Sequence, residues 1–437
     1  MMNKQFYVVI IFFFNCNQAM EMVQHKSQDA WRNEFNQLSK EQYNKSVGYN
    51  FNLRLWLDDR ENVVHTYPSL LAHGFSASDT TMIEWARVDG SHRIPGDAVT
   101  FCFKDAFTSS GSFILHSSFG QINDIKSFLV ALRAMYDCKI KGCNLFGQSR
   151  GGGTIPNALA VLNTQSDEWD KGFDTIKSFF KEHDRLAIIR MLKNGVVVLD
   201  TPMVTSHAGL EAHVNKVTRG CWLEKHVSSL IDNKVLPIVT LGNYSPSGAQ
   251  ALNSVKNLPE GLKVLVSYQK DDGSVGNKHD KDFAQELRNR LGEKNVWIVL
   301  GNNGGEEFDD ETWRELNVAN NAGHIQKRWG FFGLPYRAVP AHNAGFFLLL
   351  KNGVLNALFK DHGGSCLQDE AKLHQGKKIL EGSQPESLEK FFVPGNYDIN
   401  SDVKNLKHKF ITSNGWFSRQ QIVGFVAVFF NFLMRFK

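Results

Sequence analysis

Short, almost continuous apolar runs alternate with amphipathic segments along residues 49–300, and no other feature constrains the fold as much. Strands buried on both faces read as continuous apolar runs, because helices cover each side of a parallel sheet. The intervening segments repeat apolar residues at helical spacing. We therefore predict an α/β fold, a mostly parallel twisted sheet with helices on both faces. The predicted strands are residues 51–57, 63–72, 97–103, 143–146, 196–199, 262–268 and 296–300, and the clearest predicted helices are 121–136, 154–162 and 280–291.

The segments outside this alternation indicate the domain organisation. Residues 49–350 hold the predicted strands and form the main domain. Residues 203–258 are too long for an ordinary connection between two strands, and such insertions at the catalytic edge of a sheet often become lids. Residues 20–48 are a polar lead-in, and residues 351–437 are a helical C-terminal extension with an apolar tail.

The two ends of the chain carry apolar runs. Residues 1–19 combine an early lysine, a short apolar run and a polar exit, as expected for a secretory signal peptide. We therefore predict an exported protein, whether periplasmic, extracellular or membrane-associated. The apolar run in residues 422–434 is too short to span a bilayer. It is interpreted either as a membrane-surface attachment or as a helix packed on the domain itself.

Charge and cysteine spacing exclude several other classes. The chain has 49 basic and 45 acidic residues without long single-sign runs, so it gives no electrostatic case for nucleic-acid binding. The six cysteines form no pair or cluster with zinc-ligand spacing. We therefore predict no metal and no cofactor.

A G-x-S-x-G sequence at a strand-to-helix junction indicates the chemistry. It reads Gly147-Gln148-Ser149-Arg150-Gly151, with an apolar strand before it and an apolar helix after it. A serine at the tip of such a turn has a strained backbone, and a Cβ at either flanking glycine would collide with the strand or the helix. The hydroxyl is then exposed beside the positive end of the helix, so Ser149 is the predicted nucleophile.

A second motif ends an earlier buried strand, where His73 and Gly74 follow a run of apolar residues. With the G-x-S-x-G turn, it makes residues 50–350 resemble the α/β-hydrolase superfamily, in particular its esterase, lipase and prolyl-oligopeptidase-like serine hydrolases. The resemblance implies an oxyanion hole made of two backbone N–H groups. They would belong to Phe75 and Arg150.

The resemblance also implies an acid after a strand that follows the nucleophile. The family's usual pattern there is G-x-x-D-x-x-V. Aligned on this chain, it puts Gln269 in the glycine position, which is a departure, and Asp272 in the acid position. The adjacent Asp271 is the alternative. The acid would hold the histidine tautomer and stabilise the imidazolium.

The base should follow the last strand, and two histidines qualify. His324 follows a glycine, as is common in the family, whereas His342 precedes the better predicted helix. Either residue requires a long loop after the strand ending at residue 300, and the choice stays open.

These residues together predict a serine hydrolase that forms an acyl-enzyme on Ser149. The substrate would be an ester, thioester or amide, carried by a small, lipid-like or peptide molecule, because the same machinery serves all three bonds. Two alternatives stay open: a non-catalytic binding protein on a hydrolase scaffold, and an acyltransferase that excludes water.

Overall fold

A computed structural model of the chain describes most of the predicted main domain and parts of its flanks. The described residues are 30–48, 53–61, 63–64, 66–74, 93–103, 120–205, 208, 229–235, 250–269, 279–301, 349–350, 352–362 and 364–382. The predicted signal peptide and the apolar tail lie outside them, as does most of the predicted lid. No helix within the described ranges is long and apolar enough to cross a membrane.

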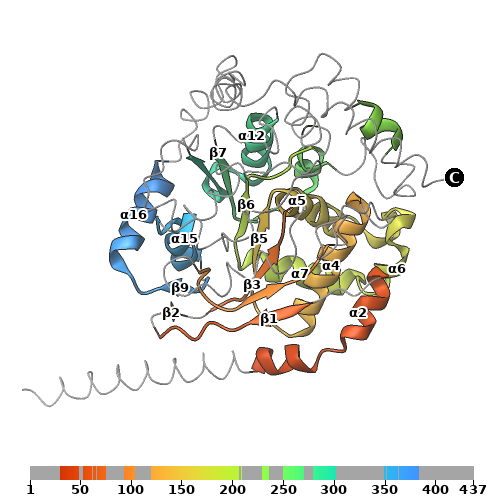
Figure 1. Cartoon of the computed structure of the whole chain (residues 1–437), viewed down its shortest axis with the longest axis horizontal. Helices are drawn as coiled ribbons and strands as arrows, with labels where there is room; N and C mark the ends of the chain where they lie inside the picture. The colour runs from red at the N-terminus through yellow and green to blue at the C-terminus, as the bar shows by residue number, and fades with distance from the viewer. Residues whose placement is uncertain are drawn as a thin grey trace, which may run out of the picture.

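A seven-stranded sheet forms the centre of the described structure (Figure 1), in the spatial order β1-β4-β3-β5-β6-β7-β8. All neighbouring strands in it are parallel except β1, which pairs antiparallel with β4. A separate two-stranded sheet pairs β2 with β9. The strands are β1 Arg54–Trp56, β2 Val63–Val64, β3 Ser69–Ala72, β4 Ala98–Thr100, β5 Asn144–Gln148, β6 Val197–Asp200, β7 Val264–Gln269, β8 Val296–Gly301 and β9 Cys366–Leu367.

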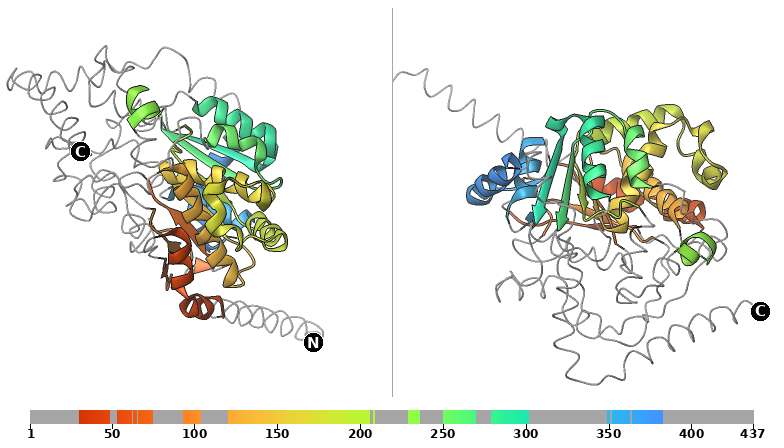
Figure 2. Two further views of the ribbon diagram at one scale, coloured as in Figure 1. Left: turned by 90° about the vertical axis from the view of Figure 1, so that its right-hand side faces the viewer. Right: turned by 90° about the horizontal axis from the view of Figure 1, so that it is seen from above.

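Helices cover both faces of the large sheet (Figure 2). Leu145 and Val197 point to a core shared with α4, α5, α7 and α12, whereas their neighbours Phe146 and Val198 point to a core shared with α15. The predicted fold class is confirmed. The α-helices are α2 Lys40–Val47, α4 Gln121–Asp137, α5 Arg150–Asn163, α6 Asp174–Lys177, α7 Glu182–Lys193, α11 Ala251–Ser254, α12 Asp280–Leu291, α15 Val354–His362 and α16 Glu370–Glu381. Short 3-10 or π turns are η1 Ser166–Glu168, η2 Lys171–Phe173, η3 Ile231–Val235, η4 Val255–Asn257 and η5 Glu293–Asn295.

The prediction of one strand over residues 63–72 is wrong. The run contributes β2 to the small sheet and β3 to the large one, and Pro68 stands between them. Proline has no N–H for a strand ladder, so it interrupts the pairing. The Pro68 carbonyl instead accepts a hydrogen bond from the backbone N–H of Asn144 at 3.0 Å, where β5 begins.

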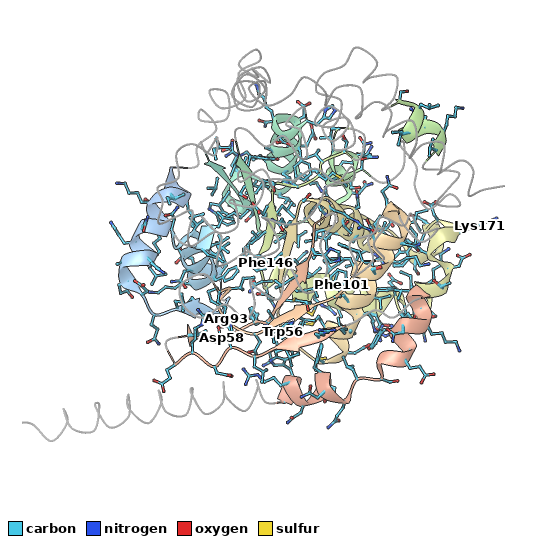
Figure 3. The ribbon with its side chains drawn as sticks, in the orientation of Figure 1. Trp56, Asp58, Arg93, Phe101, Phe146 and Lys171 are labelled. Carbon is cyan, nitrogen blue, oxygen red and sulfur yellow. The ribbon has the colours of Figure 1, made fainter. Side chains whose placement is uncertain are left out.

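A charged network fastens the helical residues 30–37, which precede α2, to the sheet at the amino end of β4. Arg32 donates two hydrogen bonds to the Asp97 carboxylate, at 2.7 and 2.8 Å. Asp58 accepts from the Arg60 side chain at 2.8 and 2.9 Å, and the Arg93 guanidinium lies beside it (Figure 3). Buried carboxylates need such partners, so the network satisfies charges that would otherwise oppose folding.

Candidate functional site

Ser149 occupies a sharp turn between β5 and α5, at the carboxyl end of the parallel strands. Its backbone has φ 52° and ψ −113°, a conformation that an L-residue rarely adopts. Its N–H donates to the Asp200 carbonyl at 2.9 Å, and its own carbonyl accepts from the N–H groups of Gly153 and Met203 at 3.0 and 2.9 Å. Strain of this kind persists only where the surroundings hold it and is concentrated at functional sites.

The glycines around Ser149 have no room for a side chain. A Cβ on Gly147 would lie 2.6 Å from the carbonyl carbon of Gly151, and one on Gly151 would lie 2.2 Å from the carbonyl oxygen of Ala72. A Cβ on Gly153 would lie 2.2 Å from the Met203 carbonyl oxygen. Strand, turn and helix therefore pack backbone against backbone, which is why the sequence requires glycine here.

The His73-Gly74 turn lies directly beside the serine. Ala72 pairs with Gly147 in adjacent parallel strands, and this register brings the two turns to the same edge of the sheet. A Cβ built on Gly74 would come within 3.3 Å of the Ser149 Cβ. The structure therefore brings together two of the predicted elements, although they are far apart in the sequence.

The His73 ring links two backbone segments by hydrogen bonds. Its Nε2 accepts a hydrogen bond from the Phe103 N–H at 2.9 Å, which requires that Nε2 be unprotonated. The proton then lies on Nδ1, which donates to the Gly74 carbonyl at 2.8 Å. The ring is fully buried and neutral, and it ties the turn after β3 to the end of β4.

A serine with positive φ between a parallel strand and a helix, at the carboxyl end of a mostly parallel sheet, has the geometry of the G-x-S-x-G turn, called the elbow below, of the α/β-hydrolase fold. The chain has an α/β-hydrolase fold. No protein-family model and no curated protein matches it.

Three solved structures illustrate what this chain is similar to. An esterase from Pyrococcus furiosus is 12% identical, covers 64% of this chain and 95% of its own, and has a TM-score of 0.31. A lipase/esterase from Lactobacillus plantarum is 10% identical, and the match covers 62% of this chain and 93% of the lipase/esterase, with a TM-score of 0.37. An acylaminoacyl peptidase from Pyrococcus horikoshii is 13% identical, and the match covers 58% of this chain and 35% of the peptidase, with a TM-score of 0.34. Similarities this low give no information about what this chain acts on.

Arg150 opens α5, and its backbone N–H is one of the two predicted oxyanion donors. Its side chain turns away toward α4 and is buried against Asp124. A cavity of about 20 Å³ lies beside this pair and reaches Gly153, Asn157 and Gln250. That space suits a water molecule and is too small for a substrate.

The other predicted site residues lie outside the described residues. They are Phe75, Asp271, Asp272, His324 and His342. The segment with both aspartates starts just after Gln269, the end of β7. Strands lie about 4.8 Å apart, so the ends of β5 and β7, separated by β6, are about 10 Å apart.

Two buried carboxylates beside the elbow were missed by sequence reasoning. Asp200 ends β6, in register with Gln148, and its side chain accepts a hydrogen bond from the Ser267 hydroxyl. Asp124 lies in the first turn of α4. An acidic residue there is typical of any helix N-terminus, so the sequence offered no signal for its pairing with Arg150.

Proposed function

We propose that this protein is a serine hydrolase and that Ser149 is its nucleophile. The observation that carries the proposal is the Ser149 backbone, which is held at φ 52° on the N-terminus of α5 by glycines without room for a Cβ. A strained backbone at a serine costs stability, and residues of this kind cluster at functional sites. In this position its hydroxyl stands beside the positive end of a helix, where negative charge is stabilised.

The proposed reaction is acyl transfer to water. The histidine takes the Ser149 proton as the oxygen attacks the carbonyl carbon, and the backbone N–H groups of Arg150 and Phe75 hold the resulting oxyanion. Collapse of this intermediate expels the alcohol, thiol or amine, which receives the proton from the histidine. Water then attacks the acyl-enzyme and gives a proton to the histidine. The acid is released as the Ser149 oxygen leaves and takes that proton back.

The acid of this triad is proposed to be Asp272 or Asp271. Both follow β7 within three residues in the sequence, and β7 ends at the same edge of the sheet as Ser149. Asp200 is a described carboxylate at the end of the strand next to the elbow, but its side chain accepts a hydrogen bond from Ser267 on the neighbouring strand. We assign Asp200 to the support of the sheet edge, and Asp200→Asn belongs in the test as a third acid variant.

The proposal is tested by hydrolysis of short-chain p-nitrophenyl esters. Ser149→Ala should lose roughly 10⁴-fold or more in kcat, because the triad acts as a unit. kcat should fall as far in one of the two variants His324→Ala and His342→Ala, and the other variant should keep the wild-type kcat. Asp272→Asn and Asp271→Asn separate the acids in the same way. Wild-type turnover retained by a folded Ser149→Ala would overturn the proposal.

The substrate class is proposed as a small, lipid-like or peptide molecule with an ester, thioester or amide bond, met outside the cytoplasm. The apolar tail, residues 416–437, is proposed to attach the enzyme to a membrane surface. Its deletion should abolish co-sedimentation with phospholipid vesicles and leave turnover of a soluble ester unchanged. Unchanged co-sedimentation would remove the membrane role.

A further inference from the structure

A buried ion pair lies one residue beyond the proposed nucleophile. Arg150 Nε donates to Asp124 Oδ2 at 2.7 Å, and Arg150 Nη2 donates to Asp124 Oδ1 at 2.6 Å. The two side chains are only 2% and 9% exposed. This two-bond geometry fixes the plane of the guanidinium as well as its distance, which a single contact does not.

The same guanidinium reaches the second turn of the site through an aromatic ring. Its central carbon lies 5.0 Å from the centre of the Phe103 ring. Phe103 packs on the His73 ring at 4.8 Å and donates its backbone N–H to it. His73 in turn donates to the Gly74 carbonyl. A continuous series of contacts therefore links the elbow residue Arg150 to the His73-Gly74 turn.

A hydrogen bond within α5 holds the backbone of Arg150. Its carbonyl accepts a hydrogen bond from the Thr154 hydroxyl at 2.9 Å, one turn further along α5. Asp124 is itself fixed, because its N–H donates to the Gly120 carbonyl at the start of α4. The side chain of Arg150 is thus held by α4, and its main chain is held by a later residue of α5, its own helix.

We propose that Asp124 is a positioning residue, which through the Arg150 side chain sets the place of the Arg150 backbone N–H relative to the His73-Gly74 turn. This inference rests on the proposed function, since the N–H matters only where an oxyanion forms. Donors of an oxyanion hole act when they are aimed, without rearrangement, at the position the oxyanion will take. A displacement of about 1 Å is enough to cost about 100-fold in rate.

The test compares Asp124→Asn with Asp97→Asn. Both remove the charge from a buried carboxylate that accepts two hydrogen bonds from one arginine, but Asp97 lies at the opposite, amino end of β4. A fluorophosphonate titrates the reactive serine in each variant, so kcat is expressed per titrated site. A trifluoromethyl ketone, which adds to the serine and places an oxyanion, gives an inhibition constant Ki.

We expect kcat per site of Asp124→Asn to fall about 10- to 100-fold with KM within about threefold, because the loss is confined to the transition state. Ki for the ketone should rise by the factor by which kcat/KM falls. Asp97→Asn should lower the melting temperature but leave kcat per site within about twofold, since its charge lies far from the elbow.

Three outcomes overturn the inference: equal kcat per site in wild type and Asp124→Asn, an unchanged Ki, or an equal loss in Asp97→Asn. If Asp124→Asn does not fold, because the Arg150 charge is left unpaired, the double variant Asp124→Asn/Arg150→Gln takes its place with the same expected losses. Failure of the proposed function is a different result, because wild type itself would then neither hydrolyse esters nor react with the fluorophosphonate.

Discussion

Substitution of Gly151 by alanine tests how the elbow is held. The new Cβ would lie 2.2 Å from the Ala72 carbonyl oxygen and 2.9 Å from that of His73, whereas ordinary contacts begin near 3.4 Å. Both obstacles are backbone atoms, and Ala72 is fully buried and paired with Gly147 in the sheet. No side chain can rotate away, so α5 and the end of β3 must separate by about 1 Å.

That displacement has two consequences of predictable size. Overpacking of a tight interior costs about 1–3 kcal/mol, so the free energy of unfolding should fall by about that amount. The same shift moves Ser149 and the Arg150 N–H away from the His73-Gly74 turn, which should lower kcat by about 100-fold. Urea unfolding followed by circular dichroism and hydrolysis of a p-nitrophenyl ester measure the two effects.

Gly382→Ala is the matched control. Gly382 has φ −76°, and a Cβ there would lie 3.4 Å from the nearest atom, the Lys378 carbonyl oxygen. We expect a change in unfolding free energy within about 0.5 kcal/mol and no change in rate. If Gly151→Ala proved as stable and as active as Gly382→Ala, the close packing of the elbow on β3 would be refuted.

Three further predictions concern other positions. Gly74→Ala should change the unfolding free energy by less than about 1 kcal/mol but lower kcat, because its Cβ would press on the Ser149 Cβ at 3.3 Å; an unchanged kcat in the ester assay would contradict this. Burial, and then the nearby charges of Asp137 and Glu34, raise the pKa of the Cys138 thiol to about 12, so it should react with Ellman's reagent at pH 8 only after unfolding. Burial alone would raise the pKa of Asp58, but the hydrogen bonds and charge of Arg60 and the charge of Arg93 outweigh it and lower that pKa. The contribution of Asp58 to stability is therefore present above its unfolded pKa of about 4 and lost as the pH falls below it. Asp58→Asn should be less stable than wild type at pH 7, and a gap in melting temperature that did not narrow in acid would contradict the assignment.

The alternation of apolar runs with helical segments predicted the sheet well. A parallel strand that is buried on both faces must be apolar at nearly every position, so it stands out in the sequence. The predicted helix over residues 280–291 coincides with α12. The error over residues 63–72 arose because hydrophobic runs do not reveal a change of sheet. Proline was the local signal for it, and Pro68 lies at the break.

The elbow was predictable for a different reason. Gly147 is fixed by its contact with Gly151 and Gly152 of the helix that follows it, and such a local requirement appears in the sequence. Gly151 is fixed by the end of β3, but it belongs to the same short G-x-S-x-G pattern and is found with it. The pairing of Arg150 with Asp124 joins two helices across 26 positions, and no local rule indicates it. The hydrogen bond between the His73 ring and the Phe103 N–H likewise forms only once β3 and β4 are paired, so the sequence did not indicate it.

The central claim is that Ser149 is a nucleophile, and mass spectrometry after reaction with a fluorophosphonate tests it most directly. The folded wild type should gain one adduct, and peptide mapping should place it on Ser149 and on no other serine. Ser149→Ala and unfolded wild type should gain none, because the reaction needs both the hydroxyl and the assembled site. Folded wild type without an adduct, or with one on another residue, would contradict the account.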